Sequence, residues 1–316
     1  MKDLTTVKQG KATPVQDRSG IYIKEQRQIL NRWTEHCSEL YNQKANGDPS
    51  VLTCPQTDTE DNHPILRKEL EAAVQSLKKG KSAGVHNIPA ELVQAGEEDV
   101  IPLSRQFASR SGRQKVTTLP KKGNLQQCQN YRTIGFISHP SKVMLKIILN
   151  RLKLQAEKII AEEQADFRAG RSTTEQIFDL RILCEKYLQH QQDLYHVFID
   201  FKKAFDRVWH AALWGTMKKY NISTNLIQVI KNLYNKAISA VLFNSSIGGW
   251  FRTTVGVRLG YLFSPTLFNI FLERIMTDAL EDNEGTVSIG GRTTTNLRFN
   301  NDIDGIAGGR RTGKIS

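Results

Sequence analysis

The sequence is poor in cysteine and lacks any long apolar run. None of its four cysteines forms a C-x-x-C pair, so the sequence offers neither a common zinc-site pattern nor a disulfide framework; they are Cys37, Cys54, Cys128 and Cys184. No apolar stretch approaches the roughly 20 residues of a membrane-spanning helix, and residues 1–10 lack the apolar core of a signal peptide. We therefore expect an intracellular protein, cytoplasmic or nuclear or both, with reduced thiols, no disulfide partner and no membrane contact.

Two lysine- and glycine-rich segments lack residues that a phosphate-binding loop requires. Gly80-Lys-Ser82 is preceded by Gln75 at the position of the first glycine, and the segment Gly308–Lys314 is followed by Ile315 instead of Ser or Thr. We expect no nucleotide-binding loop at either place. Residues 308–316 are predicted to be a disordered tail.

Positive charge dominates the composition. The 316 residues carry a formal net charge of +12, and 39% of them are hydrophobic, which is enough for a globular core. A strongly basic protein favours polyanionic partners, and nucleic acid is the leading candidate. The alternative is a basic surface that serves solubility and has no dedicated partner.

Apolar periodicity divides the chain into segments. Residues 1–63 are predicted to hold a flexible lead, one amphipathic helix along Ile29, Trp33, Cys37 and Leu40, and a linker. Residues 64–192 are mainly of helical pattern, and residues 193–307 combine strands, helices and hairpins.

The stretch His196–Val208 is the centre of the chain. An apolar, β-prone run ends at Asp200, and helical spacing begins soon afterwards. A carboxylate at the end of a buried strand is held rigidly, which suits it to bind Mg²⁺ and substrate phosphates. The alternative role for Asp200 is to cap the following helix.

The segment Ile199-Asp-Phe-Lys-Lys-Ala-Phe-Asp206 resembles motif A of the reverse transcriptases of non-LTR (LINE-type) retrotransposons. Further segments resemble that family in the same order, and together they cover most of the chain; they are Leu119–Gly123, Asn130–Arg132, Ser138–Lys142, Phe167–Ser172, Val255–Arg258 and Ser264–Asn269. The resemblance implies an RNA-directed DNA polymerase that uses Mg²⁺, dNTPs, an RNA template and a DNA primer.

The resemblance also implies an α+β fold with a right-hand polymerase-like palm. We expect an antiparallel sheet built from Leu194–Asp200 and the hairpin around Asp302, backed by helices. Residues 193–307 would form this palm, and residues 64–192 would form incomplete fingers mixed with palm elements. Because the sequence stops soon after Asp302, we expect a fragment without a thumb.

By the same resemblance, Asp200 and Asp302 are the catalytic metal ligands. Asn301 stands where the family has another aspartate, and Asn300 stands where it has alanine. An amide brings no negative charge, and one charge contact near 4 Å is worth about 4 kcal/mol at an effective dielectric of about 20. We therefore predict impaired catalysis. Asp304 lies about 6–7 Å further along a strand and is not expected to compensate.

Other positions match family residues that contact the incoming nucleotide. Lys121 and Arg132 would hold its phosphates, and Phe205 would stack under the sugar. Arg258 and Gly260 would belong to motif B, in which Leu259 replaces a glutamine. The alternatives are a solvated basic face for the two cations and a helix-core role for Phe205.

Two further hypotheses remain open. The chain could be a non-catalytic remnant that binds nucleic acid through phosphate contacts, with strongly salt-dependent affinity. It could also be a decayed coding sequence without a selected activity. Asn300, Asn301 and Leu259 favour both over an active polymerase.

Overall fold

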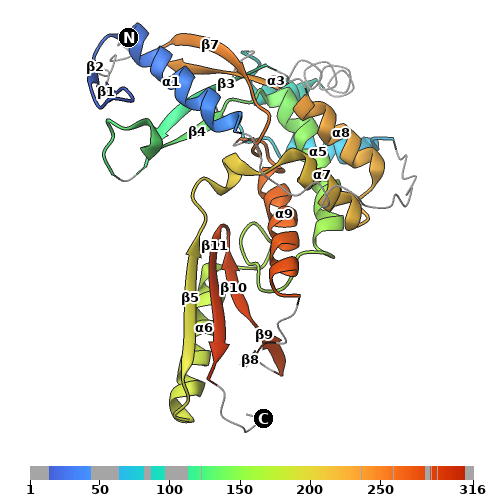
Figure 1. Cartoon of the computed structure of the whole chain (residues 1–316). Coiled ribbons are helices and arrows are strands. Elements are labelled where there is room, and N and C mark those ends of the chain that lie inside the picture. The colour runs from blue at the N-terminus through green and yellow to red at the C-terminus, as the bar shows by residue number, and fades with distance from the viewer. Residues whose placement is uncertain are drawn as a thin grey trace, which may run out of the picture.

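Two principal sheets and several helices make up an α+β architecture, as predicted (Figure 1). The computed structural model describes residues 14–43, 64–81, 87–96, 113–121, 123–235, 237–258, 260–281, 285, 287–289 and 291–309. The predictions for Cys54, Leu259 and the tail from residue 310 onward lie outside these ranges.

A mixed four-stranded sheet has the order β4-β3-β6-β7. Its strands are β3 (Arg113–Pro120), β4 (Tyr131–Gly135), β6 (Ile238–Phe243) and β7 (Ser246–Arg252). Strands β6 and β7 form a hairpin. Asn244 and Ser245 both have positive φ, at 45° and 62°, which is the geometry of a two-residue hairpin turn.

One face of this four-stranded sheet is covered by α1 (Gln26–Tyr41). The predicted apolar positions of this helix are all buried, with Trp33 and Cys37 packed into a cluster that includes Val116, Val241 and Phe251. The structure therefore confirms the helix predicted from its apolar spacing.

A short ribbon precedes α1. Strand β1 (Val15–Gln16) pairs with β2 (Tyr22–Ile23), and Val15 is buried in the α1 cluster. This differs from the flexible lead predicted for this segment. Strands of only two residues leave no alternating pattern in a polar sequence, so they could not be detected there.

The largest core lies between four helices, α5 (His139–Ala156), α7 (His210–Lys219), α8 (Thr224–Asn235) and α9 (Ser264–Ala279). Two shorter helices, α2 (Arg67–Gln75) and α3 (Ala90–Ala95), pack on α5. Ser264 is the first residue of α9, and its hydroxyl donates to the carbonyl of Arg258 at 2.7 Å.

The second principal sheet, called the palm sheet below, is antiparallel with the order β10-β11-β5. Its strands are β5 (Leu194–Asp200), β10 (Asn296–Phe299) and β11 (Asp302–Gly308). Helix α6 (Thr173–Gln189) packs against it through Leu183 and Tyr187, and the predicted capping box of Ser172 and Glu175 opens this helix. A small hairpin of β8 (Val287–Ile289) and β9 (Arg292–Thr294) lies beside the palm sheet (Figure 1).

The described helices include none with the length and apolar character needed to cross a bilayer.

Candidate active-site cleft

The two predicted metal ligands meet at one end of the palm sheet. Strand β5 ends at Asp200, β11 begins at Asp302, and the antiparallel register pairs these residues directly. Directly opposed residues project to the same face, with Cα atoms about 4.5–5.5 Å apart. Both side chains are exposed. The fold thus brings together two carboxylates that are 102 positions apart in the sequence.

Asn301 lies in the turn that connects β10 and β11. The preceding residue, Asn300, has a φ of +61°, a conformation that asparagine tolerates better than most residues. The Nδ2 group of Asn301 donates to Asp200 Oδ1 at 2.9 Å and to the carbonyl of Phe201 at 3.3 Å. The amide therefore occupies an oxygen of the very carboxylate that would ligate a cation.

The carboxylate pair has the chemistry to hold Mg²⁺. This ion is commonly bound by one or two carboxylates together with water and substrate phosphates, so Asp200 and Asp302 fit it. Within the described ranges, no group of three or more His, Cys, Asp or Glu side chains has a metal-ligating arrangement. The amide of Asn301 lies where a further carboxylate would complete such a group.

Asp304 is engaged elsewhere. It is 8% exposed, and its Oδ2 lies 3.0 Å from Nδ1 of His196. Burial raises the pKa of this carboxyl group, and the contact with His196 partly opposes that rise. Asp304 lies two residues along β11 from Asp302, and its carboxylate is engaged by His196.

A cleft of about 720 Å³ opens beside Asp200 and Asn301. Four of the residues predicted to bind the nucleotide line it, namely Lys121, Arg132, Phe205 and Gly260. Sequence reasoning missed several other lining residues, which are Leu40, Gln43, Gln129, Lys202, Lys203 and Arg207. Because the wall carries five lysine and arginine side chains close to few carboxylates, the cleft suits an anionic ligand.

Phe205 belongs both to the core and to the cleft. It lies in a 3₁₀ turn, η5 (Ala204–Arg207), that follows Asp200. Its ring stacks on Phe268 of α9 with centroids 4.4 Å apart and meets Phe167 edge-on at 6.5 Å. The two roles weighed from the sequence are therefore compatible, because the core contacts fix the ring at the cleft wall.

Only glycine fits at position 260. Its φ is +118°, and a Cβ there would lie 2.6 Å from the carbonyl oxygen of Gly135. This close approach holds the segment after β7 against the end of β4, which carries Arg132. Gly260 thus brings the two walls of the cleft together.

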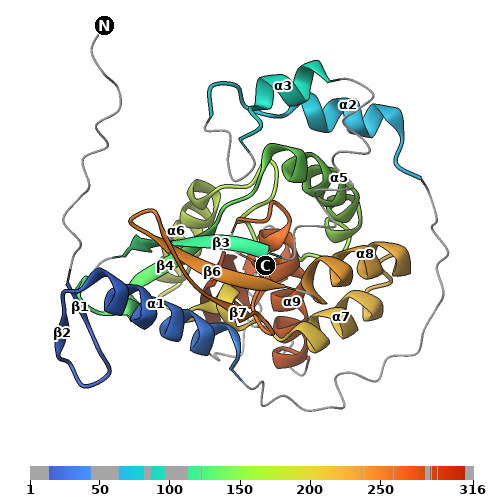
Figure 2. The ribbon, with the colours of Figure 1, turned by 90° about the horizontal axis from the view of Figure 1, so that it is seen from above.

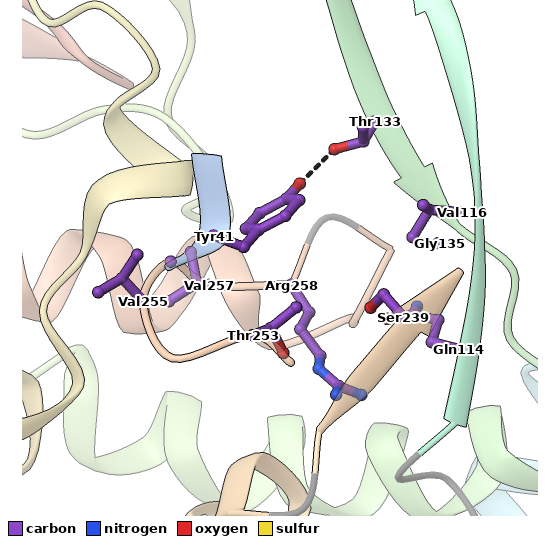
Figure 3. A pocket seen from close by; sticks show the side chains of 11 residues that line it. Tyr41, Gln114, Val116, Thr133, Gly135, Ser239, Thr253, Val255, Val257 and Arg258 are labelled. Carbon is purple, nitrogen blue, oxygen red and sulfur yellow. Dashed lines mark hydrogen bonds between the residues drawn. The ribbon is translucent and has the colours of Figure 1, made fainter. Parts of the chain in front are cut away.

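Arg258 lies outside the cleft lining, unlike the other predicted nucleotide contacts. It is 7% exposed and borders a separate cavity of about 20 Å³ beside Tyr41, Gln114 and Thr133 (Figure 3). Its Nη1 donates to the hydroxyl of Tyr261 at 2.8 Å. Tyr261 itself lines the cleft, so Arg258 lies one side chain behind the wall.

A buried hydrogen-bonded chain joins three elements behind the cleft. The hydroxyl of Tyr41, at the end of α1, contacts Thr133 of β4 (Figure 3). It also donates to Asp206 Oδ1 at 3.2 Å. Burial raises the pKa of Asp206, while hydrogen bonding from Tyr41 and the charge of Lys203 oppose the rise. No local pattern indicates that Tyr41 reaches Asp206, because the contact spans 165 positions.

Comparison with known proteins identifies the family. The profile described as "Reverse transcriptase (RNA-dependent DNA polymerase)" matches residues 119–294, more than half of the chain. The "Transposon TX1 uncharacterized 149 kDa protein" of Xenopus laevis is 28% identical over 226 residues, covering 66% of this chain and 17% of that protein. The "Probable RNA-directed DNA polymerase from transposon BS" of Drosophila melanogaster is 28% identical, covering 66% of this chain and 24% of that protein.

A solved structure was also matched. Telomerase from Candida tropicalis, truncated from its C-terminal domain, has a TM-score of 0.48 and 16% identity, covering 70% of this chain and 49% of that one. The chain spans less than a quarter of the length of the two curated relatives. The profile match and these two transposon relatives agree with the motifs around Asp200: the chain belongs to the reverse transcriptase family.

Proposed function

We propose that this chain is the nucleotide-binding and metal-binding part of an intracellular RNA-directed DNA polymerase, with weakened catalysis. The observation that supports this most directly is the register pairing of Asp200 with Asp302 beside a cleft lined by lysine and arginine. The ligands would be a dNTP and a DNA primer paired to an RNA template. The site combines carboxylates for a metal with cations for phosphates.

The residues that line the cleft have different roles in this proposal. Lys121 and Arg132 hold the triphosphate, for which ammonium and guanidinium groups are suited. Phe205 supports the sugar of the nucleotide, and the stacking on Phe268 keeps its ring in place. Mg²⁺, when bound, stabilises the charge on the attacking and leaving oxygens of the transferred phosphate.

The proposed weakness lies in the amide of Asn301. It offers no charge and donates a hydrogen bond to Oδ1 of Asp200, so that bond competes with a cation for this oxygen. A loss of about 4 kcal/mol, if it fell entirely on the transition state, would lower the rate by about three powers of ten. We expect the native chain to extend a primer very slowly or not at all.

Primer extension on poly(A)/oligo(dT) tests this proposal. The native chain is compared with a variant carrying Asn300→Ala, Asn301→Asp and Leu259→Gln, and with the same variant carrying Asp200→Asn as a control. We expect Mg²⁺-dependent extension by the triple variant, and none by the triple variant that also carries Asp200→Asn. Rapid extension by the native chain would contradict impaired catalysis, and extension that survives Asp200→Asn would contradict the assigned site.

The second candidate is a nucleic-acid-binding protein without catalysis. The five cations of the cleft wall favour it, because they persist beside the altered Asn301. Binding through phosphate contacts releases counterions, so the logarithm of affinity should fall linearly with the logarithm of salt concentration. Equal affinity for an oligonucleotide at low and high salt would argue against this candidate.

A further inference from the structure

The four-stranded sheet has a second face, opposite α1, that the cleft does not explain. The strand registers align Arg113, Ile238 and Arg252 in one row across β3, β6 and β7. The row two residues along contains Lys115, Ala240 and Trp250. Since every second residue of a strand points to the same side, both rows lie on one face.

Helix α1 packs on the other face of the sheet. Its partners in the strands are Val116, Val241 and Phe251, which alternate with the residues of the two rows. Figure 2 shows α1 along one side of the strands. Arg113, Trp250 and Arg252 are exposed, and Trp250 keeps 46% of its surface accessible to solvent.

The charge on this face has one sign. The strands β3, β4, β6 and β7 contain no aspartate or glutamate, and all four of their basic residues fall on this side; they are Arg113, Lys115, Arg132 and Arg252. Arg132 is in register with Leu119, which is four residues after Lys115 and therefore on the same side. Because Arg132 also lines the cleft, the basic face runs from the far end of the sheet to the cleft.

An aromatic ring lies among these cations. The guanidinium carbon of Arg113 lies 5.6 Å from the centroid of the Trp250 ring, within the range of a cation–π contact. Such a contact holds the two side chains beside each other. An exposed tryptophan flanked by basic residues offers a base-stacking surface next to phosphate-binding groups.

We propose that this face, defined by Arg113, Lys115, Trp250 and Arg252, binds a single-stranded nucleic acid segment outside the cleft. A base stacks on Trp250 or on the guanidinium plane of Arg113, and the neighbouring cations contact the backbone phosphates. The charge of the face selects a polyanion, and the flat ring selects unpaired bases over a duplex, whose bases are stacked on each other. The binding does not require an active cleft.

Fluorescence anisotropy with a labelled 12-nucleotide oligouridylate tests this surface on the full chain. Trp250→Ala should weaken binding by about tenfold, because one base–aromatic stack is worth about that much, and should leave the salt dependence unchanged. Trp250→Phe should bind nearly as the native chain does. Trp250 is exposed, as are Arg113 and Arg252, which are substituted below. The thermal unfolding of each variant should therefore stay close to that of the native chain.

The paired substitution Arg113→Gln with Arg252→Gln should act differently. Each lost phosphate contact on a single strand reduces the magnitude of the negative slope of log affinity against log salt by about 0.7, so the pair should reduce it by about 1.4. Lys68→Gln with Lys158→Gln removes the same charge from exposed positions on α2 and just after α5, and should change the slope much less.

Three results would overturn the proposal. Native-like binding by Trp250→Ala is one, and an unchanged salt slope in the double arginine variant is another. The third is self-association of the chain that Trp250→Ala abolishes while oligouridylate binding persists, because the ring would then belong to an interface between two copies. A polymerase that fails in primer extension, yet binds oligouridylate through Trp250, would leave this proposal standing.

Discussion

At the scale of single residues, the cleft is lined by one buried carboxyl group, that of Asp206, as well as by the exposed one of Asp200. Asp206 lies six positions after Asp200, and burial raises its pKa above the ordinary value of 3.8. A carboxyl group with a raised pKa favours the folded state when protonated. That contribution is complete below pH 3.8 and is lost as the pH rises through the higher value in the folded chain.

Asp206→Asn should therefore stabilise the chain more at pH 7 than at pH 3.5. Asparagine cannot ionise, and its side-chain oxygen can still accept the hydrogen bond from Tyr41. The measurement is the difference in Tm between variant and native chain at the two pH values. A difference that is the same at both pH values would contradict the raised pKa, and one that is more negative at pH 7 would show that the fold favours the charged carboxylate.

Single residues also show what sequence could and could not predict. The meeting of Asp200 and Asp302 at one end of the palm sheet could be predicted, because each lies in a short local pattern. The hydrogen bond from Asn301 to Asp200 could not, because it depends on the rotation of one side chain in a turn. Arg258 matched its motif equally well, yet its guanidinium group points toward Tyr261 behind the cleft wall.

At the scale of elements, the palm sheet is fastened to the helical core by a buried ion pair. Arg298 of β10 lies 3.1 Å from Glu273 of α9, and their side chains are 3% and 9% exposed. The same glutamate accepts a hydrogen bond from the backbone amide of Ala161 at 3.0 Å. Removing one partner of a buried pair leaves the other charge uncompensated, which costs about 3–5 kcal/mol.

Glu273→Gln should lower the free energy of unfolding by about that amount, measured by urea denaturation. Glutamine keeps an oxygen for the amide of Ala161, so the loss reports mainly on the charge. Glu185→Gln is the matched control, because Glu185 pairs with Arg181 at an exposed site where about 1 kcal/mol or less is expected. Equal effects of the two substitutions would contradict the role assigned to the buried pair.

Elements with regular patterns were predictable, and irregular ones were not. Helix α1 and the capping box of α6 follow from apolar spacing and from Ser172 with Glu175. The ribbon of β1 and β2 is too short to leave a pattern. Strand β3 was also missed, because its alternation of polar and apolar residues is incomplete and its partners β4 and β6 are distant in the sequence.

At the scale of the whole molecule, the cleft forms where separate parts of the chain meet. The palm sheet supplies Asp200, and the end of α1 supplies Leu40. Lys121 directly follows β3, and Arg132 lies in β4. The family resemblance predicted that Lys121, Arg132 and Asp200 would converge, and all three line the cleft. It did not predict that α1, placed in a separate leading segment, would contribute to the cleft, because no local pattern encodes a contact made over such a separation.

The central proposal is a cation site formed by Asp200 and Asp302 and weakened by Asn301. Titration with Mn²⁺, followed by electron paramagnetic resonance of the free ion, measures this without requiring activity. Asn301→Asp should bind the ion at least tenfold more tightly than the native chain, and adding Asp200→Asn should remove that gain. Equal Mn²⁺ affinity of the native chain and Asn301→Asp, or a gain that persists without Asp200, would contradict the claim.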